Sequence, residues 1–316
     1  MAGLLNDRLA DARLGQQSGW RSGRYTPCSL TKLALSIASC IPPATQRNNQ
    51  LKFLGLLILA DVRQDPALFW NYIFMTRTPP AFFLCLGLPG SASTWVFNIA
   101  AHLLSQPPRS LVSGYLDKNL PVFLEQLKVS EKSVDVVLLK SHQADAGVFE
   151  FLSNQAAPCV LSIRDPRDCV VSLMERFGYT FDYALAAVRK SCVALLMFRG
   201  PSALELRYET HFYQSGATLA ALRQHLTPDL AIDLNQLAQM YSRAAIDHHI
   251  KHFDYLPPGR IQKRGDDEYD GIAHWHRNHF GDGLSGKWRS RLDADQIALA
   301  NQALGEALQE LGYSID

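Results

Sequence analysis

The stretch FFLCLGLPGSASTW, from Phe82 to Trp95, decides the fold of this 316-residue chain. Its first five residues form a continuous apolar run with the length of a strand buried on both faces, which favours a parallel sheet covered by helices. Gly87 to Thr94 form a turn of small and hydroxyl-bearing residues, and a helix is predicted to begin near Trp95. Backbone amides and the positive end of a helix dipole hold anions in such turns. The stretch therefore predicts an anion site at the end of a strand.

The turn itself contains no lysine or arginine. A Walker A loop ends in Gly-Lys followed by Ser or Thr, whereas this turn ends in Ala92-Ser93-Thr94. An ordinary ATP or GTP site is therefore disfavoured.

A second strand end carries a lysine and a histidine. Residues 134–142 read VDVVLLKSH, a short β-rich run that ends in polar residues. Because alternate residues of a strand point to the same side, Lys140 and His142 are expected to leave the strand together. Active sites of open α/β sheets lie at such carboxyl strand ends, so the pair places a cation beside a base.

A third strand end carries an arginine. Residues 158–172 read PCVLSIRDPRDCVVS, in which Arg164 ends the strand and Pro166 opens a helix. Ser172 follows Arg164 by eight residues, a little over two helical turns. The guanidinium and the hydroxyl are therefore able to flank one anion.

These segments together resemble the PAPS-dependent sulfotransferases, whose donor is 3′-phosphoadenosine 5′-phosphosulfate (PAPS) and whose fold is a P-loop-like parallel sheet. The family's 5′-phosphosulfate loop reads close to P-[KR]-S-G-T-T-W, and this chain has Pro89-Gly90-Ser91-Ala92-Ser93-Thr94-Trp95. The family's catalytic K-[TS]-H segment matches Lys140-Ser141-His142. Its 3′-phosphate segment, an arginine followed eight residues later by a serine, matches Arg164 and Ser172.

Two further segments extend the resemblance, which runs in matching order from about Phe82 to the C terminus. The family carries a Gly-x-x-Gly-x-Trp stretch on a loop that covers the donor, and residues 283–289, GLSGKWR, are similar to it. Residues 206–209, LRYE, resemble the family's L-x-Y-E strand end. The resemblance implies that further donor contacts come from Tyr208, Gly286, Lys287 and Arg289.

The activity implied by the resemblance is transfer of the sulfuryl group of PAPS, a co-substrate, to a hydroxyl or amine of a small-molecule or carbohydrate acceptor. The implied mechanism is in-line displacement with His142 as general base, since histidine takes up a proton near neutral pH. No metal is implied. The basic residue of the family's first loop is Gly90 here, and Lys140 is the first candidate to supply that charge, ahead of the loop amides and of Lys287 or Arg289.

Two other functions stay open. A P-loop-type kinase would share the sheet topology, although the missing Walker lysine counts against it. A PAPS-binding protein with weakened catalysis would fit the glycine at position 90.

Several side chains have a structural interpretation beside the functional one. Trp95 either stacks on adenine or anchors a helix start in the core. Arg164 either holds a phosphate through two N–H groups or pairs with a helix-terminal aspartate, and the motif favours the phosphate. Arg167 is interpreted as a solvated partner of carboxylates, Asp168 as a first-turn helix residue, and Trp288 as a lid or packing residue.

Composition fits an ordinary soluble globular protein with a large core, because 47% of the residues are hydrophobic and the formal net charge is +1. The near-neutral charge and the lack of long basic blocks argue against a nucleic-acid partner. The six cysteines show no CxxC spacing, which favours reduced thiols and a cytoplasmic location.

We predict two parts: a helical accessory segment, residues 1–80, and a single three-layer P-loop-like α/β domain, residues 81–316, with a central parallel sheet flanked by helices. The first residues lack the design of a secretion signal. The apolar run at residues 51–60 is too short for an integral membrane segment and is interpreted as a core or interface helix. Acceptor binding and formation of a homodimer are both open for the accessory segment.

The middle of the domain, where the acceptor is expected to bind, has fewer signals. Residues 177–198 and 219–253 are predicted to be amphipathic helices. Six histidines gather in two groups, one within the second helix and one before the 283–289 loop: His248, His249 and His252, then His274, His276 and His279. The first group lacks the glutamate of a zincin motif, so a solvated helix face is preferred and no metal is predicted. For the second group a role near the donor or acceptor is open.

Overall fold

The computed structural model of the protein describes residues 80–116, 120–126 and 134–315. The predicted accessory segment, its apolar run and Cys28 and Cys40 lie outside these residues, apart from Pro80. Five parallel strands form the main sheet in the order β2-β3-β1-β4-β5. The strands are β1 (Ala81–Gly87), β2 (Leu111–Tyr115), β3 (Val136–Ser141), β4 (Cys159–Ile163) and β5 (Ala203–Arg207). This arrangement confirms the predicted α/β class with a central parallel sheet.

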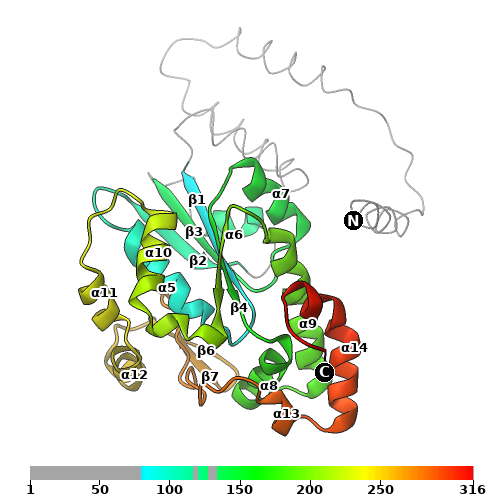
Figure 1. The fold of residues 1–316 in the computed structure, drawn as a ribbon. Coiled ribbons are helices and arrows are strands. Elements are labelled where there is room, and N and C mark those ends of the chain that lie inside the picture. The colour runs from blue at the N-terminus through cyan, green and yellow to red at the C-terminus, as the bar shows by residue number, and fades with distance from the viewer. Residues whose placement is uncertain (1–79, 117–119, 127–133, 316) are drawn as a thin grey trace, which may run out of the picture. The chain divides into compact units, whose positions relative to one another are not determined.

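Helices cover both faces of the sheet (Figure 1). One face packs against α5 (Ser93–Leu104), which in turn contacts α10 (Gly216–Leu226). The other face packs against α9 (Phe181–Phe198), which contacts α7 (Ala146–Asn154) and α14 (Ala294–Glu310). The remaining helices of four or more residues are α6 (Leu120–Gln126), α8 (Pro166–Phe177), α11 (Leu234–Met240), α12 (Arg243–Lys251) and α13 (Trp288–Arg291).

The first strand supplies much of the core, as its continuous apolar pattern predicted. Residues Phe82 to Leu86 are all buried, with alternate side chains directed toward the two helical layers. Burying a large apolar side chain stabilises the fold by about 1.5–3 kcal/mol relative to leaving it exposed. The neighbouring central strands β3 and β4 are buried along their whole length, whereas the edge strands β2 and β5 are mostly half-buried.

The strand register brings the three predicted motif ends to one edge of the sheet. Leu86 of β1 lies opposite Ser141 of β3, and Gly87 lies opposite Ser162 of β4. An antiparallel hairpin, β6 (Ile261–Arg264) and β7 (Asp267–Asp270), lies near this edge with α8 and α13, toward the bottom of Figure 1. Because parallel strands end on the same side, three segments distant in sequence meet there.

The predicted helix at residues 219–253 is wrong as a single element, because this region forms α10, α11 and α12. Pro228, just after the end of α10, has no N–H with which to continue a helical ladder. Asp233 and Ser242 then start α11 and α12, since their side chains accept hydrogen bonds from the first helical amides. The region 177–198 is helical from Phe181, after Gly178 ends α8 in a left-handed conformation.

Four cysteines fall among the described residues, and all four are buried free thiols: Cys85, Cys159, Cys169 and Cys192. Among these residues, no helix is both long and apolar enough to cross a lipid bilayer.

Candidate functional site

The first loop turns sharply between β1 and α5. Gly90 and Ala92 both have left-handed backbones, with φ of 73° and 62°. The Ser91 hydroxyl fixes the loop from within, because it donates to the Leu88 carbonyl at 2.6 Å and shares a hydrogen bond with the Ser162 hydroxyl at 2.9 Å. Helix α5 begins at Ser93, two residues earlier than predicted. The amides of Trp95 and Val96 donate to the Ala92 carbonyl, which leaves those of Ser93 and Thr94 to bind an anion.

Close packing explains the glycine at position 90. A Cβ added there would lie 2.5 Å from the Ser172 Oγ atom and 2.9 Å from the Ser172 Cβ atom. These distances are too short for any side chain, and the left-handed φ adds strain for a residue other than glycine. The loop and helix α8 therefore leave no room for the lysine or arginine that the family pattern expects.

Replacing Gly90 with alanine is expected to lower the free energy of unfolding by about 2–4 kcal/mol, because overpacking adds to the cost of the left-handed backbone. The matched control is Gly178→Ala, since Gly178 also has a left-handed φ, 64°, but nothing within 4 Å of its added Cβ. The control is expected to lose only about 1 kcal/mol. Urea unfolding of the two variants measures the difference, and equal losses would contradict the close packing at Ser172.

Lys140, at the end of β3, reaches the first turn of α5. It is buried, and its Nζ donates to the Thr94 Oγ1 at 2.8 Å and lies 5.7 Å from the centre of the Tyr115 ring. Burial, together with the charge of Arg176, lowers the pKa of Lys140 to about 7, while Cys85 acts in the opposite direction. The ammonium group is therefore a titratable charge beside the loop.

His142 contacts the other end of the same loop. Its Nδ1 lies within hydrogen-bonding distance of the Gly87 carbonyl. Because a carbonyl only accepts, Nδ1 carries the proton, and Nε2 keeps a free lone pair. Burial lowers the pKa of His142 to about 3, with a further contribution from the charge of Lys140. The imidazole is therefore neutral at physiological pH with Nε2 unprotonated, and its low pKa makes it a weaker base than the expected proton uptake near neutral pH implied.

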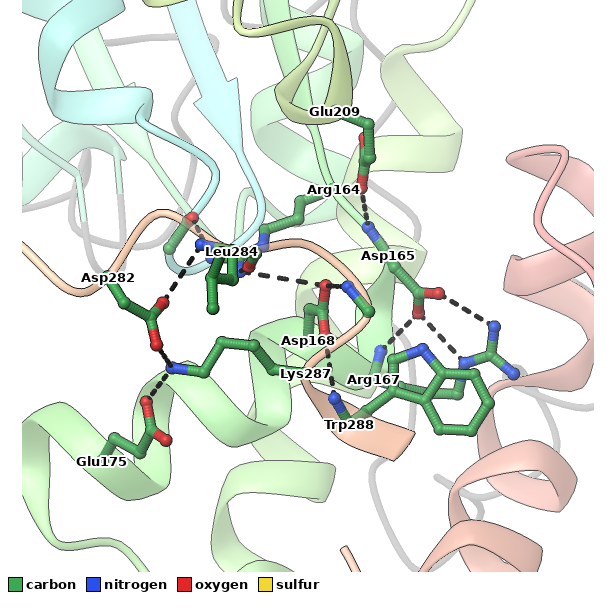
Figure 2. Close-up of polar contacts among 12 residues, drawn as sticks. Arg164, Asp165, Arg167, Asp168, Glu175, Glu209, Asp282, Leu284, Lys287 and Trp288 are labelled. Atoms are coloured by element: carbon green, nitrogen blue, oxygen red, sulfur yellow. Dashed lines mark hydrogen bonds and ion pairs between the residues drawn. The ribbon is translucent and has the colours of Figure 1, made fainter. Parts of the chain in front are cut away.

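Arg164, at the end of β4, joins the first loop to the 283–289 loop. Its Nη1 donates to the Gly90 carbonyl at 2.9 Å and its Nη2 to the Leu284 carbonyl at 2.8 Å (Figure 2). The guanidinium lies 4.2 Å from the centre of the Tyr208 ring, and its ion pair with Asp168 is long, at 3.8 Å. Within the described part of the chain, the buried Nε atom has no hydrogen-bond partner.

Asp168 fixes the 283–289 loop on helix α8, a role that its sequence position did not reveal. Its carboxylate accepts hydrogen bonds from the amides of Gly286 at 2.6 Å and Trp288 at 3.0 Å. Lys287 lies between Glu175 and Asp282, with 2.9 Å to the latter (Figure 2). Burial acts to lower the pKa of Lys287, but the hydrogen bonds to these two carboxylates outweigh it and raise the pKa. The loop is thus held in place by α8.

The interpretation of Arg167 as a solvated side chain is wrong. It is 1% exposed, pairs with Asp165 at 2.8 Å and lies 3.8 Å from the centre of the Trp288 ring. It is buried because Trp288 covers one side and the region of Asn301 on α14 covers another, with a hydrogen bond to the Asn301 side chain at 3.0 Å. Arg167 is nevertheless a carboxylate partner, as predicted, and the buried Trp288 is a packing residue.

One cavity unites most of the predicted donor residues. It encloses about 950 Å³ of space, including the open solvent at its mouth. The predicted residues that line it come from four separate segments: Gly90, Ala92, Trp95, Arg164, Ser172, Tyr208 and Lys287. The others of the first loop, Pro89, Ser91, Ser93 and Thr94, belong to the same turn, and Gly286 is tied to Asp168 beside it. Arg289 lies apart, because it lines a second hollow with Asp165 and Tyr313.

Trp95 is a core residue, as its structural interpretation predicted, and stacking on adenine stays a prediction. It is buried in the main apolar cluster, and its Nε1 donates to the Tyr241 carbonyl at 2.9 Å. The same side chain also lines the cavity, so its ring is available for stacking.

Sequence reasoning missed Arg176, which also lines the cavity. It follows Ser172 by four residues on α8, and that spacing places two side chains on one helix face. The signal was therefore present once the helix was recognised. Among the described residues, no group of three or more His, Cys, Asp or Glu side chains is placed to hold a metal ion.

A comparison with solved structures finds a related fold. The crystal structure of mouse sulfotransferase SULT7A1 complexed with PAP matches with a TM-score of 0.52 and 12% sequence identity, covering 74% of this chain and 86% of that one. No protein-family model matches the sequence, and no curated protein is a match. At 12% identity the likeness concerns the fold alone, which this chain shares with that sulfotransferase.

Proposed function

We propose that this protein is a sulfotransferase that moves the sulfuryl group of PAPS to a hydroxyl or amine of an acceptor. The observation that carries this proposal is the convergence on one cavity of the first loop, Arg164 with Ser172, Tyr208 and Lys287. These segments resemble the donor motifs of the family in the same order. The segments meet at the carboxyl ends of parallel strands, and α/β enzymes bind nucleotides at such strand ends.

The residues present fit a donor with two anionic groups. Among the described residues, the buried Nε of Arg164 has no hydrogen-bond partner, and Gly90 lets the first loop pack directly against Ser172, 2.5 Å from an added Cβ, so that the loop and Ser172 lie together at the cavity. In this proposal Arg164 and Ser172 hold the 3′-phosphate, and the α5 amides with Ser93 and Thr94 hold the phosphosulfate. When bound, PAPS would supply an activated sulfuryl group.

The chemistry assigned to the chain is proton removal and charge neutralisation. His142 Nε2 accepts the proton of the acceptor hydroxyl, while Nδ1 stays bonded to the Gly87 carbonyl. The acceptor oxygen forms a bond to sulfur as the bond between sulfur and the phosphate oxygen breaks. Lys140 and the α5 amides neutralise the charge that develops on that phosphate, in place of a cation at Gly90.

Replacing Lys140 with methionine is expected to lower turnover by about 10²–10³-fold, the cost of one preorganised donor to a developing anion. Protonated Lys140 is the active form, so wild-type kcat/KM is expected to fall as pH rises through about 7. In a plot of kcat against pH, the fall is expected at higher pH than in the plot of kcat/KM, because the bound anionic donor raises the pKa of Lys140. Rates measured from pH 5.5 to 9.5 test this at the precision of about a pKa unit. A methionine variant that keeps the falling limb would exclude Lys140 as its cause.

Calorimetry with 3′-phosphoadenosine 5′-phosphate (PAP) and with ATP tests the proposed function. A 3′-phosphate site is expected to bind PAP in strong preference to ATP, whereas the opposite preference would support a kinase. Because Gly90 removes one cation, a PAPS-binding protein with weakened catalysis is the second candidate. Radiolabelled PAPS with carbohydrates, phenols and natural-product hydroxyls separates the two, since only the enzyme would label an acceptor.

A further inference from the structure

Arg176 is a half-buried cation that forms no ion pair with a carboxylate of the described residues. Its Nε donates to the Asn278 carbonyl at 3.3 Å, and the guanidinium lies 5.0 Å from the centre of the Phe177 ring. Within the described part of the chain, no carboxylate forms an ion pair with it, in contrast to Arg164 and Arg167 near the start of the same helix. Charges withdrawn from water are normally paired, so this guanidinium has unused capacity for an anion.

The Arg176 side chain lines the cavity, so an anion bound there is able to reach it. Arg176 and His279 both line it, and Arg176 lies one helical turn beyond Ser172. Arg164, the residue assigned to the donor 3′-phosphate, also lines the cavity. Burial lowers the pKa of Arg176 to about 10, against the opposing charge of Asp267, so it remains protonated at physiological pH.

The groups around Arg176 leave a surplus of positive charge. Asp267 is the nearby carboxylate, and it is already bound to His276, whose Nδ1 lies 2.7 Å from one of its oxygens. Burial keeps the pKa of His276 and His279 low, and the charge of Arg176 lowers both pKa values further. The charge of Lys140 acts in the same direction on both imidazoles. The other carboxylates that line the cavity are bound elsewhere: Asp168 pairs with Arg164, and Glu175 and Asp282 pair with Lys287. Asp267 is therefore the carboxylate whose charge acts on Arg176, against the charge of Arg164.

His274 supplies a second unsatisfied group in this region. Its Nε2 is buried with no hydrogen-bond partner among the described residues, and its φ of 56° is a strained left-handed value. Strained backbones persist where the surroundings hold them, and they are common at ligand sites. The His274 ring lies 6.2 Å from the Tyr115 ring, which is 5.8 Å from the ring of His142. The His274 and His142 rings thus both lie beside Tyr115, and neither side chain is among those that line the cavity.

We propose that the acceptor carries an anionic group, a carboxylate or an ester sulfate or phosphate, which Arg176 and His279 hold while the reacting hydroxyl or amine lies at His142. This inference rests on the proposed function and names the acceptor class for the same site. With a neutral acceptor, the partly buried Arg176 guanidinium would have only the nearby charge of Asp267, which does not pair with it directly. An anionic acceptor gains a charge-assisted hydrogen bond there, and Arg176 is able to make it bidentate.

Matched acceptor pairs test the proposal by binding as well as by transfer. The phenolic pair is ethylphenol and hydroxyphenylpropionate, and the sugar set is methyl glucoside, methyl glucuronide and glucose 6-sulfate. Calorimetry on the PAP-loaded full chain measures each affinity, and radiolabelled PAPS measures kcat/KM. The anionic members are expected to bind at least about tenfold more tightly than their neutral partners, the effect of one hydrogen bond to a charged group. The two sugar anions distinguish a carboxylate from an ester sulfate.

The Arg176→Gln variant is expected to reduce that preference to near parity while PAP affinity stays within about twofold of wild type. Arg176→Lys keeps the charge and is expected to keep part of the preference, which guards against a folding defect. The matched control is Arg189→Gln, because Arg189 is exposed on α9 and does not line the cavity.

Three results would overturn the proposal: no preference for any anionic probe, an unchanged preference in Arg176→Gln, or an equal loss of PAP affinity, which would assign Arg176 to the donor. Failure of wild-type protein to bind PAP would instead overturn the proposed function. In that case the affinities for anionic and neutral probes are measured on the protein without PAP. Equal affinities would contradict the proposed role of Arg176 in holding an anion.

Discussion

Replacing His142 with alanine is expected to lower the rate of sulfate transfer by about 10²–10⁴-fold, the usual contribution of a general base. The Nδ1 bond to the Gly87 carbonyl fixes the tautomer that leaves Nε2 as the acceptor of the proton. The low pKa, about 3, keeps Nε2 unprotonated across the physiological range. Single-turnover assays with radiolabelled PAPS measure the effect, and calorimetry is expected to show PAP affinity within about twofold of wild type because His142 acts on the acceptor.

A matched histidine variant separates this effect from a general loss of imidazole. His248 is on α12, stacks on the ring of His252 at 4.0 Å and does not line the cavity. His248→Ala is expected to retain wild-type turnover. If His142→Ala also transferred sulfate at the wild-type rate, another group would have to be the base.

Replacing Arg164 with glutamine is expected to weaken PAP binding by about 10²-fold, the worth of one or two hydrogen bonds to a charged phosphate. Affinity for adenosine 5′-phosphate, which lacks the 3′-phosphate, is expected to change much less. The ratio of the two affinities is the measurement that matters, because Arg164 also holds the carbonyls of Gly90 and Leu284. Calorimetry with both nucleotides gives the ratio.

The Arg164 prediction needs a check on the loops that this side chain joins. Thermal unfolding of the ligand-free variant reports how far their loosening destabilises the fold, and Arg189→Gln is again the exposed control. An equal loss of affinity for both nucleotides would assign Arg164 to holding the loops instead of contacting the 3′-phosphate.

The sequence was sufficient to predict the class of fold and the three strand ends. The apolar runs before Gly87, Ser141 and Arg164 are local signals, and a buried parallel strand needs little more than such a run. The turn after the first run was also predictable, because glycine and hydroxyl residues between a strand and a helix favour turn conformations of the backbone. The position of α5 then differed from the prediction by only two residues.

Where the neighbours of a side chain come from distant segments, its burial and its partners could not be predicted from local sequence patterns. Arg167 was expected to be solvated because it lies among charged residues, yet Trp288 and α14 bury it. Asp168 was read as a helix-start residue, although its carboxylate binds amides more than 100 residues away, at separations of 118 and 120. Local patterns do not contain such contacts, because they depend on how the C-terminal part packs on α8.

Arg164 has a further consequence for the catalytic cycle. Two of its nitrogens donate to the carbonyls of Gly90 and Leu284, so the guanidinium already has acceptors within the protein. Under the proposed function, the departure of PAP would return the guanidinium to these two carbonyls instead of leaving it bare. We expect this exchange to weaken nucleotide affinity and to favour product release, a step that limits turnover in many enzymes.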